Sequence, residues 1–164
     1  MKNWVVILVS IILLILDNSL MPFLAIRGAF PSLLFIFAIS YSLVKGGTEA
    51  VIVGAFSGIL QDIFFYNGMG INSLSNLLLC VLAAFVGENI FKNKRLIPVL
   101  TMVIVSIIKV GVVYIFIKVN GNDINIRMAL LSSVYNAIVL FFGYNFVLKL
   151  CDKEYKKSSW RFRW

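Results

Sequence analysis

The sequence predicts an all-α integral membrane protein, built as one bundle of six transmembrane helices. Of its 164 residues, 61% are hydrophobic and only 13% are charged, and the mean hydropathy is +0.98. A soluble domain of this size could not cover so much apolar surface with so few charged side chains. Six apolar segments occupy residues 1–150, and a basic, aromatic tail follows at 151–164. The predicted helices are residues 3–20, 31–44, 48–65, 71–87, 96–119 and 126–150.

The first two segments differ in how they match the thickness of a bilayer. Residues 3–20 resemble the apolar region of a signal peptide, but no small-x-small cleavage site follows, so we expect a retained helix. Residues 31–44 begin with Pro31, which suits the first turn of a helix. At 1.5 Å per residue this segment spans only about 21 Å, less than the ~30 Å hydrocarbon core. It therefore either extends backward through Phe30 or has an end inside the protein.

The other four segments are bounded by turn signals. The third has Thr48 in the N-cap position and Glu49 in its first turn, where a negative charge suits the helix dipole. The fifth contains Lys109 within an otherwise apolar run. Short turns rich in glycine, asparagine or basic residues separate the helices, so nothing large projects from the bundle. These turns lie at 45–47, 66–70, 88–95 and 120–123.

Lysine and arginine predict the orientation of the bundle. With the N-terminus inside, most of the 15 cations lie on the same side as both termini, whereas Arg27, Lys118 and Arg127 lie on the other side. By the positive-inside rule, both termini are expected in the cytoplasm. These flanks account for the net charge of +8, so nucleic acid is not an expected partner. The tail at 151–164 mixes cations with aromatic residues, as in segments that lie on an anionic leaflet; an ordinary stop-transfer flank is the alternative.

The chain shows no pattern of catalytic or metal-ligating residues. It has no histidine and only two cysteines, Cys80 within an apolar helix and Cys151 at the end of another. Their spacing indicates neither a zinc site nor a disulfide framework. No nucleophile–base pair, pair of catalytic carboxylates or phosphate-binding glycine loop is recognisable. We therefore expect no enzymatic activity, no metal and no cofactor.

One glycine pair predicts a close helix contact. Gly54 and Gly58 are four residues apart, so they share one face of a helix and allow another backbone to approach closely. Asp62 lies one turn further along the same face, where a carboxylate is costly in lipid and usually has a partner or a function. The face either packs inside the bundle or receives a partner helix.

Five polar residues are predicted to share one layer toward the outer half of the bilayer. Asp17, Asp62, Lys109 and Asn136 each lie about 20 Å from the inner end of their helix, and Asn76 lies about 18 Å from it. We expect Lys109 to be neutralised by Asp62 or Asp17, because an unpaired lysine is costly in lipid. The layer either joins the helices to one another or lines a ligand cavity or an ion path.

The order of residues after this glycine pair resembles a known family. Gly54-x-x-x-Gly58-x-x-x-Asp62, a short turn and then Gly70-Ile71-Asn72-Ser73-Leu74 are similar to the core signature of the rod-shape-determining MreD family. The motif covers only about residues 54–74, but the predicted topology and the basic tail agree over the whole chain. Met69 before Gly70 and Ser73 after Asn72 are mild departures from the family pattern.

The resemblance implies a non-enzymatic subunit of the bacterial cell-elongation complex, or elongasome, in the inner membrane. Such a subunit would bind MreC and, through it, MreB, RodA and a penicillin-binding transpeptidase, and would support peptidoglycan synthesis and cell shape. The implied fold resembles the S components of energy-coupling-factor transporters, so a vitamin-binding S component is the alternative. An S component normally carries small docking residues on its first helix, where this chain has only Ser10 among bulky aliphatic residues.

Overall fold

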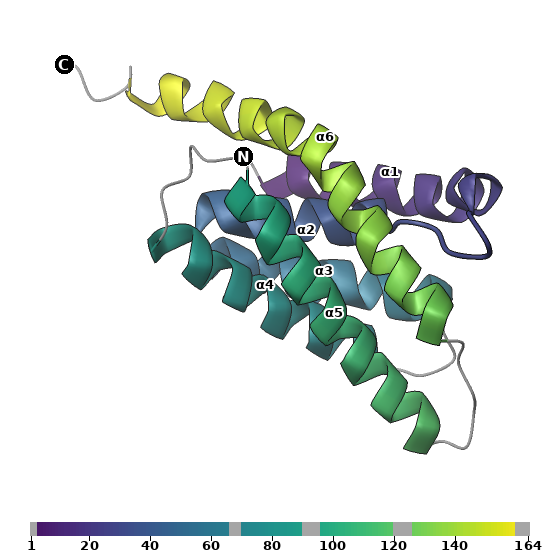
Figure 1. Ribbon diagram of the computed structural model, residues 1–164. Coiled ribbons are helices and arrows are strands. Elements are labelled where there is room, and N and C mark those ends of the chain that lie inside the picture. The colour runs from purple at the N-terminus through teal and green to yellow at the C-terminus, as the bar shows by residue number, and fades with distance from the viewer. Residues whose placement is uncertain (1–2, 66–69, 90–95, 120–125, 160–164) are drawn as a thin grey trace.

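The structure, a computed structural model, describes residues 3–65, 70–89, 96–119 and 126–159. Within these ranges every regular element is helical, which confirms the predicted all-α class. Six α-helices and one short 3₁₀ helix follow one another along the chain (Figure 1). They are α1 (Asn3–Ser19), η1 (Met21–Leu24), α2 (Leu33–Lys45), α3 (Gly47–Phe65), α4 (Ile71–Asn89), α5 (Leu96–Val119) and α6 (Ile126–Ser159).

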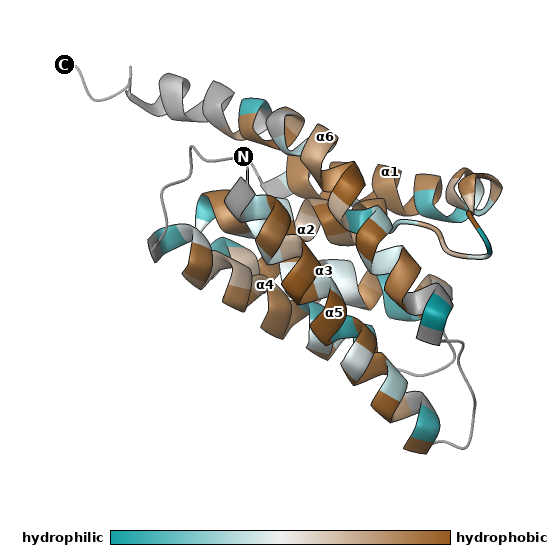
Figure 2. Cartoon of the chain, viewed as in Figure 1, coloured by the Kyte–Doolittle hydropathy of each residue, from teal (hydrophilic) through white to brown (hydrophobic). Residues whose placement is uncertain are grey.

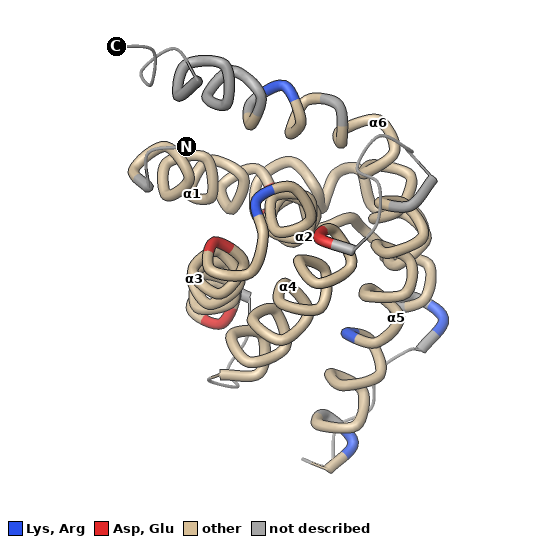
Figure 3. The backbone as a smooth tube through the Cα atoms, turned by 90° about the vertical axis from the view of Figure 1, so that its left-hand side faces the viewer, with Lys and Arg blue, Asp and Glu red and all other residues tan. Residues whose placement is uncertain are grey.

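Helix α2 is the centre of the bundle, and the other five helices surround it (Figure 3). Every residue of α2 from Leu34 to Leu43 is buried, because its sequence is apolar on all sides. The two serines in this stretch do not break the pattern. Ser40 and Ser42 each donate a hydrogen bond of 2.7 Å to the carbonyl one turn back in the same helix, so their hydroxyl groups need no other partner.

The outer faces of the surrounding helices are hydrophobic. Hydrophobic residues run along most of each helix, and hydrophilic residues gather mainly at helix ends and between helices (Figure 2). Helices α3, α4 and α5 each contain an apolar stretch of 18 or 19 residues, long enough to cross a membrane. Shorter apolar stretches occur in the other three helices, at Trp4–Ser19, Leu33–Lys45 and Leu130–Tyr144. Lipid is therefore the solvent that suits this surface.

Helices α3 and α4 form the most extensive pair, and two glycines of α3 make their close approach possible. A Cβ atom on Gly54 would lie 2.8 Å from the Cα of Leu77, and one on Gly58 would lie 2.5 Å from the carbonyl oxygen of Asn72. Helix α4 also approaches α2 closely, since a Cβ on Gly87 would collide with the Leu43 carbonyl. Backbone therefore meets backbone at these positions, as in small-residue contacts between membrane helices.

Helix boundaries differ from the predicted ones where side chains cap helix ends. Helix α2 begins at Leu33, because Ser32 is the N-cap residue and accepts a hydrogen bond from the Phe35 amide. Helix α3 begins at Gly47 rather than after Thr48, and the amide of Gly47 donates to Glu88 Oε1 at 3.0 Å. Helix α6 continues to Ser159, so the first nine residues of the predicted tail are helical.

Parts of several predicted loops lie outside the described residues, as do the last five residues of the tail. The link between α1 and α2 is described throughout. After η1 it makes a tight turn in which Ile26 and Ala29 exchange both backbone hydrogen bonds. The two central residues of this turn, Arg27 and Gly28, both have positive φ angles, as in a type I′ turn.

Candidate functional site

The central helix α2 begins inside the bundle, and a carboxylate from α1 caps its N-terminus. Asp17 is 1% exposed. Its oxygens accept hydrogen bonds from the amides of Leu33 at 2.7 Å and Leu34 at 3.1 Å, and from the hydroxyl of Ser32 at 3.1 Å. A helix end in an apolar interior must find partners for its free amides, and an acidic side chain also suits the positive end of the helix dipole. The short length of α2 is explained by this interior start.

Two amide side chains complete the cap of α2. Asn136 of α6 accepts a hydrogen bond of 2.9 Å from the amide of Ser32. Gln61 of α3 donates to the hydroxyl of Ser32 at 2.9 Å. Ser32 is therefore the point at which α1, α3 and α6 are joined to α2.

Lys109 of α5 extends this network to α4. Its ammonium group donates to Gln61 Oε1 at 2.8 Å and to Asn76 Oδ1 at 2.7 Å, and lies 4.1 Å from the centre of the Phe35 ring. The side-chain amide of Asn76 in turn donates to Gln61 Oε1 at 2.9 Å. One lysine thus ties together three helices and contacts the aromatic face of a fourth, an arrangement that favours a cation.

Asp62 caps a different helix, α4. Its carboxylate accepts hydrogen bonds from the amides of Gly70, Asn72 and Ser73 at 3.1, 2.9 and 2.8 Å, and from the Ser73 hydroxyl at 2.5 Å. Gly70 has a φ angle of 97°, so glycine suits the bend that brings the chain back to Asp62. The structure therefore brings the motif from Gly54 to Ser73 together as one α3–α4 hairpin closed by Asp62.

Four of the five residues of the predicted polar layer, Asp17, Asn76, Lys109 and Asn136, belong to one hydrogen-bonded network. Asp62, the fifth, does not join it. The expected ion pair of Lys109 with Asp62 or Asp17 is wrong as a direct contact: in the described part of the chain the ammonium group bonds only to the two amide oxygens. Both carboxylates instead accept hydrogen bonds from the amides of helix N-termini, where several donors lie close together.

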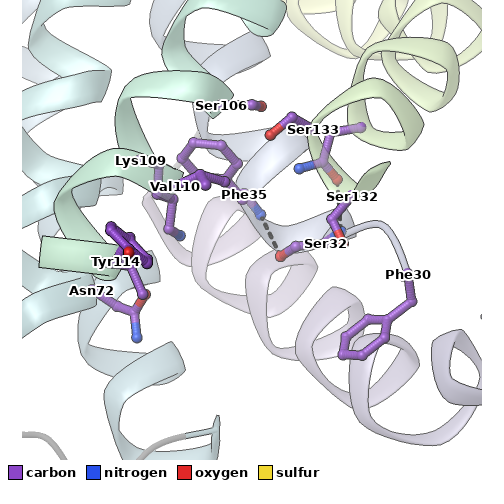
Figure 4. A pocket seen from close by; sticks show the side chains of 12 residues that line it. Phe30, Ser32, Phe35, Asn72, Ser106, Lys109, Val110, Tyr114, Ser132 and Ser133 are labelled. Carbon is purple, nitrogen blue, oxygen red and sulfur yellow. Dashed lines mark hydrogen bonds between the residues drawn. The ribbon is translucent and has the colours of Figure 1, made fainter. Parts of the chain in front are cut away.

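A cavity of about 340 Å³ lies beside this network, between α2, α4, α5 and α6. Most of the surface that lines it is apolar, and hydroxyl and amide groups lie beside the Lys109 side chain (Figure 4). The Ser106 hydroxyl, on a residue only 2% exposed, has no hydrogen-bond partner among the residues that the structure describes. The residues around the cavity are Phe30, Ser32, Phe35, Asn72, Ser106, Lys109, Val110, Val113, Tyr114, Ser132, Ser133 and Asn136.

Sequence reasoning missed three residues that matter here: Ser32, Gln61 and Ser106. A signal existed for Ser32, because a serine just before a long apolar run is a typical N-cap. Gln61 is next to Asp62 in the sequence, but its side chain bonds to Ser32, Asn76 and Lys109. Because this side chain is uncharged, the sequence does not mark it as a residue of the site. Ser106 resembles any serine of a membrane helix. It is buried without a hydrogen-bond partner among the described residues, as Ser10 of α1 also is, but of these two only Ser106 lines the cavity.

The fold and the site together define a class: an α-helical membrane protein whose buried polar residues cap helices and join them to one another. The family model described as rod shape-determining protein MreD matches residues 1–154. The chain therefore belongs to the MreD family, a family of shape-determining membrane proteins rather than of known enzymes. No curated protein and no solved structure matches the chain.

Proposed function

We propose that this chain is a multi-pass subunit of the bacterial cell-elongation complex that binds an MreC-like protein and thereby supports lateral peptidoglycan synthesis. The observation that carries the proposal is the family match over residues 1–154. In this proposal all six helices cross the inner membrane and both termini are cytoplasmic, as the distribution of lysine and arginine indicates. MreB, RodA and a penicillin-binding transpeptidase are reached through the MreC-like partner.

The chemistry of the interior supports a binding role. The polar side chains described above mostly satisfy helix ends and each other, which suits a rigid scaffold. The surface offers broad apolar faces on several helices, and a partner's transmembrane helix could pack against such a face. The glycine face of α3 is not one of them, since α4 already fills it. The family match also favours this role over the vitamin-binding alternative.

Cell shape is the first test. The gene would be placed under a repressible promoter in the bacterium that encodes it. On depletion we expect the cells to widen and become round, and a plasmid copy should restore the rods. Cells that keep their width and length after the protein has disappeared would contradict the proposed role in elongation.

Partner contact is the second test, and four exposed positions can map it. A photo-crosslinking residue would replace Leu8 on α1, Leu78 on α4, Ile104 on α5 or Phe142 on α6, each more than half exposed. Together with a co-expressed MreC homologue, we expect strong crosslinks from one face and weak ones from the others. Equal crosslinking from all four positions, or none from any, would argue against a specific complex.

A further inference from the structure

The cavity beside Lys109 has the features of a ligand site, beyond any role in partner binding. Its volume of about 340 Å³ lies within the range of small-molecule pockets. Aromatic and aliphatic side chains form one part of its wall, and hydroxyl and amide groups form the other. In Figure 4 the hydroxyl of Ser106 on α5 turns into the space between α5 and α6, where Ser133 also lies.

The charges around the cavity are unbalanced. Of the 12 described residues that line it, one is basic and none is acidic. The two nearest candidates for a counter-ion, Asp17 and Asp62, are each held by three or four donors at the N-termini of α2 and α4. Among the described residues, Lys109 bonds to two neutral oxygens and lies over the face of Phe35. A cation in an apolar interior is stabilised by a nearby anion, and the described part of the chain provides none in direct contact.

The Ser106 hydroxyl is an independent sign of a ligand. Leaving a buried hydroxyl without a hydrogen bond is destabilising. A serine in this place is explained if its hydroxyl bonds to a group inside the cavity. It is one helical turn from Lys109 on α5, so both side chains line the same wall.

We propose that this cavity binds the anionic group of a ligand, a phosphate or a similar oxyanion, with Lys109 as its counter-ion and Ser106 as a hydrogen-bond donor. Phe30, Val110 and Val113 would contact an apolar portion of the same ligand. The anion can belong to the headgroup of an acidic phospholipid or to a soluble phosphorylated molecule. The proposal stands apart from the partner assignment, because a chain without such a ligand could still bind MreC.

The test uses the full-length chain purified in a neutral detergent, with three probes: phosphatidylglycerol, phosphatidylcholine and inorganic phosphate. Native mass spectrometry counts the bound lipid, and thermal unfolding reports stabilisation by each probe. For the wild type we expect one tightly held phosphatidylglycerol, or stabilisation by phosphate alone. The first outcome assigns the site to a lipid headgroup, and the second to a small soluble anion. Equal retention of phosphatidylcholine, or no effect of any probe, would overturn the proposal.

Variants distinguish anion binding in this cavity from the non-specific attraction of anions to a basic protein. Gln61→Glu places a carboxylate beside Lys109 and removes the hydrogen bond that Gln61 donates to Ser32. The variant gains an internal counter-ion, and we expect at least a tenfold loss of anion affinity. Ser106→Ala removes a hydroxyl that has no hydrogen-bond partner among the described residues, so stability without ligand should be unchanged while affinity falls several-fold. Lys149→Gln removes an exposed charge of α6 and is the matched control. If Gln61→Glu and Ser106→Ala bind like Lys149→Gln, the cavity is not the anion site.

Discussion

The close approach of α3 to α4 makes Gly58→Ala an informative substitution. An added Cβ would lie 2.5 Å from the carbonyl oxygen of Asn72 and 2.7 Å from the amide nitrogen of Ser73, and both are backbone atoms that cannot rotate away. Gly111 on α5 and Gly143 on α6 are the matched controls, because a Cβ there meets nothing within 4 Å. All three positions lie in helices, so each substitution gains a similar amount of helix propensity.

The expected difference is large enough to measure. Alanine is favoured over glycine in a helix by about 1 kcal/mol, and overpacking a tight contact costs about 1–3 kcal/mol, here at the upper end because backbone must move. Gly58→Ala should therefore lose about 2 kcal/mol, whereas Gly111→Ala should gain up to about 1 kcal/mol. At about 2–4 °C per kcal/mol for a protein of this size, the two variants should unfold about 6–12 °C apart.

Thermal unfolding in a mild detergent, followed by circular dichroism, measures this difference. Both variants must first elute as single species, so that aggregation is not mistaken for lower stability. Midpoints of Gly58→Ala and Gly111→Ala within 2 °C of each other would refute the reasoning, because they would show that α4 does not lie against Gly58. The same result would reopen the glycine face as a site for a partner helix.

Three further substitutions test the caps and the network by the same unfolding assay. Asp17→Ala should lower the free energy of unfolding by about 2–3 kcal/mol, because it leaves buried donors of α2 unpaired, whereas the neighbouring Asn18→Ala should have little effect. Gly70→Ala should cost about 1–2 kcal/mol from its positive φ angle alone, since its Cβ would have open space; a neutral result would contradict the described turn. Gln61→Leu should destabilise more than Gln61→Glu, because leucine leaves both the ammonium of Lys109 and the amide of Asn76 short of an acceptor, and the reverse order would refute the network.

The sequence predicts the helices well because apolar runs and turn residues are local signals. Helical rise also places Asp17, Asn76, Lys109 and Asn136 at one height, and the structure joins these four in one network. Height along an axis does not say which way a side chain points around it. For that reason the direct partner of Lys109 was predicted as a carboxylate, although two amide oxygens lie closer.

The start of α2 shows a second limit of sequence reasoning. Its short length allowed an end inside the protein, but apart from the local N-cap Ser32 the residues that cap this end come from α1, α3 and α6. Nothing in the local sequence of α2 indicates which distant helices will supply them. Glu88 is a similar case, because it lies at the end of α4 and caps α3, a helix that precedes it in the chain.

The caps have a consequence for how the protein is made. The N-termini of α2, α3 and α4 each bond to a carboxylate from another helix: Asp17, Glu88 and Asp62 respectively. When α1 leaves the translocation channel alone, Asp17 has no donor in the lipid, and the same holds for Asp62 at the end of α3. In the proposed six-helix topology each acid finds its donors only when the next helix arrives, so we expect α1 to enter the bilayer together with α2, and α3 together with α4. The expected unit of membrane insertion for this half of the chain is then the helical hairpin.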